Sequence, residues 1–247
     1  MPNRKPLPLL GTHVAGLAAI ALGVIGLISA DFAAVWQPVP DTVPHRAALA
    51  YLAAILFLIA GIAIQWRRTA PAAAVLLTIL YFICSLLWLS RIIGFPRIFG
   101  SWSGFAEQFA LATSGVVACL LLARRASALT RIARSLFGLC VIAFGIAHFT
   151  ALPQTAAFVP LWIPPSQMFW AKATGVFHLL AGLAILTGIQ ARLAARLLTV
   201  MIAGFGLLVW LPALFSHPRD HFTWCANAVN LALLAAAWII ADSLRPL

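Results

Sequence analysis

Long apolar stretches alternate with short polar or proline-rich connections along all 247 residues of the chain. Each stretch is long enough, or nearly so, to cross a hydrocarbon core of about 30 Å, which takes roughly 20 helical residues. The stretches lack the alternation of a barrel strand, and a lipid-facing backbone must satisfy its polar groups within its own segment. The pattern therefore predicts an all-α integral membrane protein with eight transmembrane helices. The expected spans are 14–30, 47–64, 70–89, 104–123, 137–152, 169–189, 197–215 and 222–241.

The second half of the chain repeats the first. With a constant offset of 121, residues 60–78 and 181–199 align without a gap, and ten of the nineteen positions are identical. We therefore expect a tandem duplication. Because each copy holds an even number of spans, the copies are expected to be two parallel four-helix-bundle repeats. The expected parts are a diverged first repeat over 1–123, a basic cytoplasmic linker over 124–136 and a second repeat over 137–247.

The composition and the distribution of charge agree with a protein in lipid. Hydrophobic residues make up 64% of the chain and charged residues 9%, which is far from the balance of a soluble domain. The net charge of +11 is scattered over short connections, so we expect it to set the topology and to contact anionic headgroups, and we expect no nucleic-acid partner.

The basic residues gather on one face of the predicted bundle. The N-terminus, the even-numbered connections and the C-terminus hold Arg4, Lys5, Arg67, Arg68, Arg124, Arg125, Arg131, Arg134, Arg192, Arg196 and Arg245. The positive-inside rule therefore predicts a multi-pass protein of a bacterial inner (plasma) membrane with both termini in the cytoplasm. The four cysteines lie singly on different predicted helices, and no Cys-x-x-Cys occurs, so we expect no metal site.

The outer connections of the two halves are rich in proline and carry tryptophan. Residues 36–45 join the first two spans and residues 159–165 join the fifth and sixth. Proline excludes regular helix, and tryptophan favours the headgroup interface. We therefore expect each connection to lie as a lid over its own four-helix unit.

Polar side chains that could form a ligand site are concentrated in the second half. They are His148, His178, His217, His221, Asn227 and Asn230. At or near the first-half positions that correspond to His148 and His178, the chain has Ser29 and Phe57. Because polar groups inside a membrane usually face a bundle interior or a wet cavity, we expect the six residues to line a polar cavity that opens outward. The simpler alternative is that the two buried histidines are neutral and bonded to nearby carbonyls, and that the two outer ones are interfacial.

The second half resembles the DoxX and DoxX-like membrane proteins. The resemblance lies in the run Gly145-Ile146-Ala147-His148-Phe149, the proline-rich segment 159–164, the helix segment 174–183 and the Arg-x-Ala-Ala start at 192–195. It covers about residues 135–243, so the second repeat is expected to be DoxX-like, whereas the first half matches only weakly. The family pattern has an acid inside the sixth span where this chain has His178. The resemblance implies a four-helix unit but little about activity, because many members have no assigned reaction. The family name comes from subunits of a thiosulfate-to-quinone oxidoreductase, which makes a quinone one candidate ligand. Haem held by two histidines is a subordinate alternative.

Three classes of function are compatible with the sequence. The first is a noncatalytic membrane protein that binds a partner protein, a second copy of itself or a small ligand in the second repeat. The second is a membrane subunit of a quinone-linked oxidoreductase, in which His148 and His178 line the quinone pocket. The third is a small-molecule or ion carrier, which should show Gly or Pro breaks at matching mid-helix positions in both halves, and none is evident in the sequence. The sequence identifies no catalytic residue and leaves open whether the protein is an enzyme.

Overall fold

The computed structural model describes residues 10–125 and 127–245, so the predicted cytoplasmic charges Arg4 and Lys5 lie outside the described residues. Eight helical segments are long and apolar enough to cross a membrane, which confirms the predicted number. The described residues contain no strand. The eight spans are α1 (Leu10–Ser29), α2 (Arg46–Ala63), α3 (Ala70–Leu87) continued by α4 (Leu89–Gly94), α5 (Phe99–Leu122), α6 (Ala128–Thr150), α8 (Gln167–Thr187), α9 (Ala191–Phe205) continued by η2 (Gly206–Trp210) and α10 (Leu211–Ser216), and α11 (His221–Ser243).

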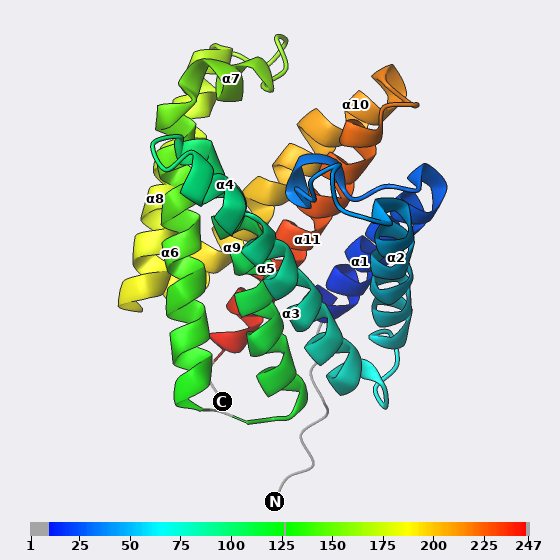
Figure 1. Ribbon diagram of the computed structural model, residues 1–247. Coiled ribbons are helices and arrows are strands. Elements are labelled where there is room, and N and C mark those ends of the chain that lie inside the picture. The colour runs from blue at the N-terminus through cyan, green and yellow to red at the C-terminus, as the bar shows by residue number, and fades with distance from the viewer. Residues whose placement is uncertain (1–9, 126, 246–247) are drawn as a thin grey trace, which may run out of the picture.

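Two short helices lie on connections between spans. η1 (Ala34–Trp36) follows α1, and α7 (Leu152–Ala157) follows α6. We call the side that carries η1, α7 and the connections after α4 and α10 the outer side, and the opposite side the inner side. In Figure 1 the outer side is at the top.

The ends of the helices recur at the offset that the sequence repeat predicts. Pairs of helix ends that lie 121 positions apart are Ser29 and Thr150, Arg46 and Gln167, Ala70 and Ala191, and Leu122 and Ser243. The interruptions recur too, since α4 and α10 occupy nearly equivalent positions near the outer ends of the third and seventh spans. The tandem duplication stays a prediction, and these shared ends favour it.

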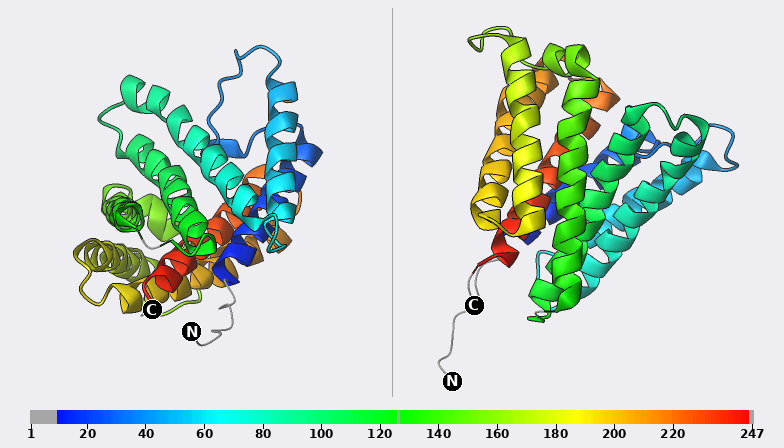
Figure 2. Two further views of the ribbon diagram at one scale, coloured as in Figure 1. Left: turned by 90° about the horizontal axis from the view of Figure 1, so that it is seen from below. Right: turned by 90° about the vertical axis from the view of Figure 1, so that its left-hand side faces the viewer.

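The last helix of each half lies in the middle of the molecule. α11 packs against α9, α5 and α1, and α5 packs against α3, α6 and α11. The left view of Figure 2 shows α11, in red, next to helices of both halves. These two spans are also the most buried of the eight. The grouping into two separate four-helix bundles stays a prediction, because extensive contacts also cross between the halves.

Small residues allow the first two helices of each half to approach closely. A Cβ atom added at Gly61 of α2 would lie 2.6 Å from the carbonyl oxygen of Gly16 in α1. At the repeat position, Gly182 of α8, it would lie 2.7 Å from the carbonyl oxygen of Gly138 in α6. Backbones pack this closely in lipid where small residues face each other. The two helix pairs therefore use the same device.

The helices extend further than hydropathy alone predicts. α6 begins at Ala128 instead of residue 137, so the non-helical part of the expected linker 124–136 is much shorter. The helical part of that segment carries Arg131 and Arg134 but no proline or glycine, so nothing interrupts the helix there. Hydropathy marks the apolar core of a span, whereas the helix continues into the headgroup region.

Candidate functional site

His148 and His178 lie side by side. Their ring centroids are 4.8 Å apart with an interplanar angle of 45°. His148 is on α6 and His178 on α8, and the close contact of these helices brings the rings together. A Cβ atom at Gly175, one turn from His178, would lie only 2.9 Å from the Cβ atom of His148. The glycine thus makes room for the histidine pair.

Both imidazoles use one nitrogen in a bond to their own helix. His148 Nδ1 lies 2.8 Å from the carbonyl oxygen of Phe144, and His178 Nδ1 lies 2.9 Å from that of Thr174. A carbonyl oxygen only accepts hydrogen bonds, so each Nδ1 carries the proton. In the neutral rings both Nε2 atoms are therefore acceptors. Among the described residues, no protein donor is bonded to either Nε2 atom.

Aromatic rings surround the pair. Phe144 meets the His178 ring edge-on, with centroids 5.9 Å apart, and Phe205 of α9 lies 6.1 Å from it. His178 is buried, with 4% of its surface exposed, and His148 is half-buried. The site is therefore an apolar environment with two polar acceptors.

The two predicted asparagines serve a different part of the second half. Asn227 Nδ2 donates to the carbonyl oxygen of Trp210 at 2.7 Å, and Asn230 Nδ2 donates to that of Ile202 at 3.2 Å. Both therefore tie α11 to the seventh span, as their spacing of three on one helical face allows. Trp210 is the last residue of η2, the π-helical interruption of that span, and Ile202 lies in α9, before η2 begins. Neither asparagine has a hydrogen bond to the histidine pair among the described residues.

The outer histidines lie at the ends of helices. His217 ends α10 and is exposed, whereas His221 begins α11 and its Nε2 atom is buried without a hydrogen-bond partner in the described part of the chain. Between them, Asp220 caps α11 by accepting from Thr223 N at 2.9 Å. Hydrogen bonds from the hydroxyl and amide of Thr223 lower the pKa of Asp220 below its usual value. Among the described residues, no hydrogen bond or ring contact joins these histidines to His148 and His178. The expected single cavity of six residues stays a prediction.

The first outer connection also contacts the second half. Trp36 of η1 is buried and stacks on Phe222 of α11, with ring centroids 5.3 Å apart. The second connection exposes Leu161 and Trp162 to the surroundings. The first connection therefore also contacts the second half, whereas a lid over its own unit stays a prediction for the second connection. Depth along the membrane, which the sequence predicts, does not determine which helix a loop contacts.

Sequence analysis missed an acid that lies inside a span of the first half. Glu107 of α5 accepts a hydrogen bond from Trp36 Nε1 at 3.1 Å. The next residue, Gln108, is 2% exposed, and its Nε2 atom has no partner among the described residues. The signal is present in the sequence, because Glu107 falls within the predicted span 104–123. Its place near the outer end of that span makes it look like one of the charges of the outer face.

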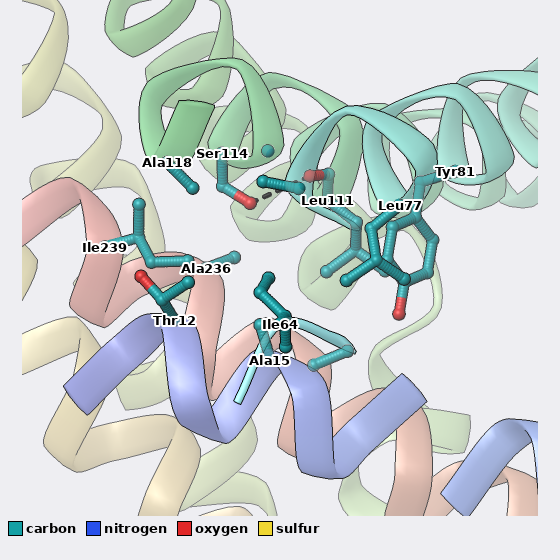
Figure 3. Close-up of a pocket in the computed structure, with 13 residues that line it drawn as sticks. Thr12, Ala15, Ile64, Leu77, Tyr81, Leu111, Ser114, Ala118, Ala236 and Ile239 are labelled. Atoms are coloured by element: carbon teal, nitrogen blue, oxygen red, sulfur yellow. Dashed lines mark hydrogen bonds between the residues drawn. The ribbon is translucent and has the colours of Figure 1, made fainter. Parts of the chain in front are cut away.

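A small cavity lies between the two halves and was not predicted. It measures about 30 Å³, enough for about one water molecule, and residues of α1, α3, α5 and α11 line it. Figure 3 shows Thr12, Ser114 and Tyr81 around the same space as Ala236 and Ile239. The hydroxyls of Thr12 and Tyr81 are buried without a protein partner among the described residues. Most of the lining is apolar, and the polar groups are hydroxyls alone.

Residues 129–214 match the family model for DoxX, from the first turn of α6 to α10. These residues form a DoxX domain. The predicted resemblance is thereby confirmed, although the match ends before α11 and does not reach residue 243. The DoxX domain contains His148 and His178, whereas the other four predicted site residues follow it. No curated protein and no solved structure matches the chain.

Neither metal nor disulfide chemistry is indicated by the described residues. They contain no group of three or more histidine, cysteine or acidic side chains placed to hold a metal ion. All four cysteines are free. The histidine pair is also unsuited to bis-histidine haem, because an iron about 2 Å from each Nε2 atom would require a porphyrin plane between rings that here lie in contact.

Proposed function

We propose that the protein is a multi-pass membrane protein whose DoxX domain binds a small, membrane-soluble ligand that carries a hydroxyl group. The observation that carries this proposal is the pair of unprotonated Nε2 atoms on His148 and His178, which lack a protein donor in the described part of the chain. A hydroxyl supplies the donor that these acceptors need. The surrounding phenylalanines favour an apolar or aromatic ligand body.

A quinol has this chemistry, an aromatic ring with two hydroxyl donors. When bound, it would supply two electrons and two protons to an oxidoreductase partner. His148 and His178 would hold its hydroxyl through Nε2, and Phe144 and Phe205 would contact its ring. The oxidised quinone has carbonyl acceptors in place of hydroxyls, so it would not satisfy an unprotonated Nε2 atom.

The proposal is tested by titrating the protein, purified in mild detergent, with decylubiquinol and with decylubiquinone. The quinol should bind the tighter of the two, by roughly tenfold or more, because an unsatisfied buried acceptor costs about 1–3 kcal/mol. His178→Phe, the residue at the repeat position, should abolish the preference. His217→Phe is the matched control, because His217 is exposed and outside the pair. Equal affinity for both ligands, or an unchanged preference in His178→Phe, would contradict the proposal.

A carrier is the second candidate, favoured by one structural observation. The third and seventh spans are both interrupted near their outer ends, at Trp88 and at η2, which lie at equivalent positions of the two halves. Interrupted helices at corresponding positions mark substrate sites in many transporters. To test for transport, Val209, the repeat equivalent of Trp88, is replaced by cysteine in a protein that lacks the native cysteines. This variant is then reconstituted into proteoliposomes. A carrier should allow an impermeant maleimide to label this cysteine from either side, whereas labelling from one side alone contradicts transport.

A further inference from the structure

One acidic side chain of the first half lies inside a span without a cationic partner among the described residues. All five acidic residues of the chain fall in the described part. Four of them have an ion pair with an arginine or cap a helix, namely Asp31, Asp41, Asp220 and Asp242. The fifth, Glu107 of α5, has neither. Its one hydrogen bond within the described residues comes from Trp36 of η1, with Nε1 donating to Oε2 at 3.1 Å.

Glu107 lies well below the outer end of its helix. α5 begins at Phe99, so Glu107 is eight residues, or about 12 Å, along the helix axis. Ala106 and Gln108 on either side are buried, and Glu107 is itself half-buried. An ionised carboxylate at this depth is costly unless a cation or water compensates its charge, so an acid in such a position tends to bind a proton instead.

Trp36 fixes the carboxyl at the contact between the central helices of the two halves. The tryptophan is 8% exposed, and its ring stacks on Phe222 of α11. α11 in turn packs on α5. The indole N–H is a single neutral donor, which does not balance a full negative charge. The protonated acid keeps this bond, because its carbonyl oxygen still accepts from Trp36.

No charged group on the helices around α5 is bonded to Glu107 in the described chain. Apart from those at the inner ends, the titratable groups on these helices and on the first outer connection are Asp31, Asp41, His45 and Arg46 on the connection and the start of α2, Tyr81 and Cys84 on α3, Arg91 on α4, Cys140 and His148 on α6, and His221 and Cys225 on α11. The arginine nearest in sequence to Trp36 is Arg46, which pairs with two aspartates.

The second half lacks this pair of residues. The repeat positions of Trp36 and Glu107 are Ala157 and Ala228, and Ala228 of α11 is 2% exposed. An apolar residue thus packs at the equivalent place of the other central helix. Packing alone therefore does not explain the acid.

We propose that Glu107 is a proton-binding site of the first half, which holds a proton at neutral pH and is covered on the outer side by Trp36. The site lies outside the DoxX domain and does not depend on the ligand proposed for that domain. Carboxyl groups inside membrane spans serve proton relays. Release of this proton leaves a carboxylate, which accepts from the Trp36 N–H more strongly than the neutral acid does. Trp36 thus influences how readily the proton leaves.

The test is infrared spectroscopy of the full chain, purified in mild detergent, at neutral pH. A protonated carboxyl gives a separate C=O stretching band that shifts in heavy water. This band should be present and should be lost in Glu107→Gln, whose amide oxygen can still accept from Trp36. Asp41→Asn is the matched control, because the exposed Asp41 pairs with Arg46 and should be ionised, so the band should remain. A spectrum without the band, or a band that survives Glu107→Gln, would overturn the proposal.

A second variant tests the role of Trp36. Raising the pH should remove the band as the proton leaves, and in Trp36→Phe the band should persist to higher pH, because the carboxylate has lost its donor. Trp102→Phe is the matched control, since Trp102 Nε1 donates to the carbonyl oxygen of Pro96 instead. Each variant is first checked by circular dichroism for an unchanged helix content. Loss of the band at the same pH in Trp36→Phe and in the unchanged chain would overturn the role assigned to Trp36.

Discussion

At the scale of single residues, the helix contacts of this protein depend on where glycine faces a backbone. Gly182 faces the carbonyl oxygen of Gly138 across the contact between α6 and α8, whereas Gly204 of α9 has no atom within 4 Å of an added Cβ atom. Close packing of the helices therefore requires glycine at position 182 but not at position 204. Both lie within membrane-spanning helices, so they can be compared directly.

Gly182→Ala should lower the free energy of unfolding by about 1–3 kcal/mol, because the new methyl group would overlap a backbone oxygen and Ile142. Gly204→Ala should raise it by about 0.5–1 kcal/mol, because alanine is the better helix former and space is available. Thermal or denaturant unfolding in one detergent measures both. A similar loss in both variants would contradict the assigned contact.

Tyr81 offers a second prediction at this scale. Its ring packs edge-on against Phe57, with centroids 5.3 Å apart, and its buried hydroxyl has no protein partner among the described residues. Because a buried unsatisfied hydroxyl costs about 1–3 kcal/mol, Tyr81→Phe should leave stability unchanged or raise it by up to about that amount. The unfolding midpoint in detergent measures the change. A clear loss of stability would mean that the hydroxyl is hydrogen-bonded, for instance to a water molecule in the small cavity.

At the scale of elements, the spans were predictable and their interruptions were not. Lipid requires continuous apolar helices, so hydropathy alone identifies all eight. The break at Trp88 and the π-helical segment η2 lie within apolar runs, and hydropathy does not respond to them. Pro212, one residue into α10, was the available signal, because proline removes a backbone donor from the helix.

The interruption of the seventh span leads to a prediction about α11. Asn227 links the two through its bond to the Trp210 carbonyl oxygen. Asn227→Leu should lower the free energy of unfolding by about 0.5–2 kcal/mol, the usual range for hydrogen bonds between membrane helices. It should also speed amide exchange around residues 206–214. Thr199→Val is the control, because the Thr199 hydroxyl bonds only to its own helix, and exchange that is equally fast in both variants would contradict the link.

Only the part of the candidate site that lies on consecutive spans could be predicted from the sequence. The sequence places His148 and His178 on consecutive spans, and the structure shows that their rings are in contact. The depth of a residue in the membrane does not specify the face on which it lies, so the sequence also grouped the outer histidines and the asparagines with this pair. The stacking of Trp36 on Phe222 joins two segments that lie far apart in the chain. Such contacts between distant segments have no signature in hydropathy or spacing.

At the scale of the whole molecule, eight spans place the start of α1 and the end of α11 on the same side. The positive-inside rule assigns this side to the cytoplasm. A fluorescent protein that matures only in the cytoplasm, fused after Leu247, should therefore fluoresce. A dark fusion, combined with activity of a periplasmic phosphatase at the same point, would contradict the predicted orientation.

The contact of α1 with α11 has a further consequence for the order of the chain. α5 and α6 are joined by a short connection, and α11 and α1 pack on each other in the corresponding way without being joined. Each half therefore packs on the other through two similar contacts, α5 with α6 and α11 with α1, and only the first of these pairs is joined by a connection. A circular permutant, with a flexible linker from residue 247 to residue 1 and new ends within 124–127, should insert and reach the same detergent unfolding midpoint within a few degrees. If the permutant is degraded while a control with the same linker inserted at 124–127 of the unpermuted chain folds, then the order of synthesis matters, and α1 must be in place before α11 is made.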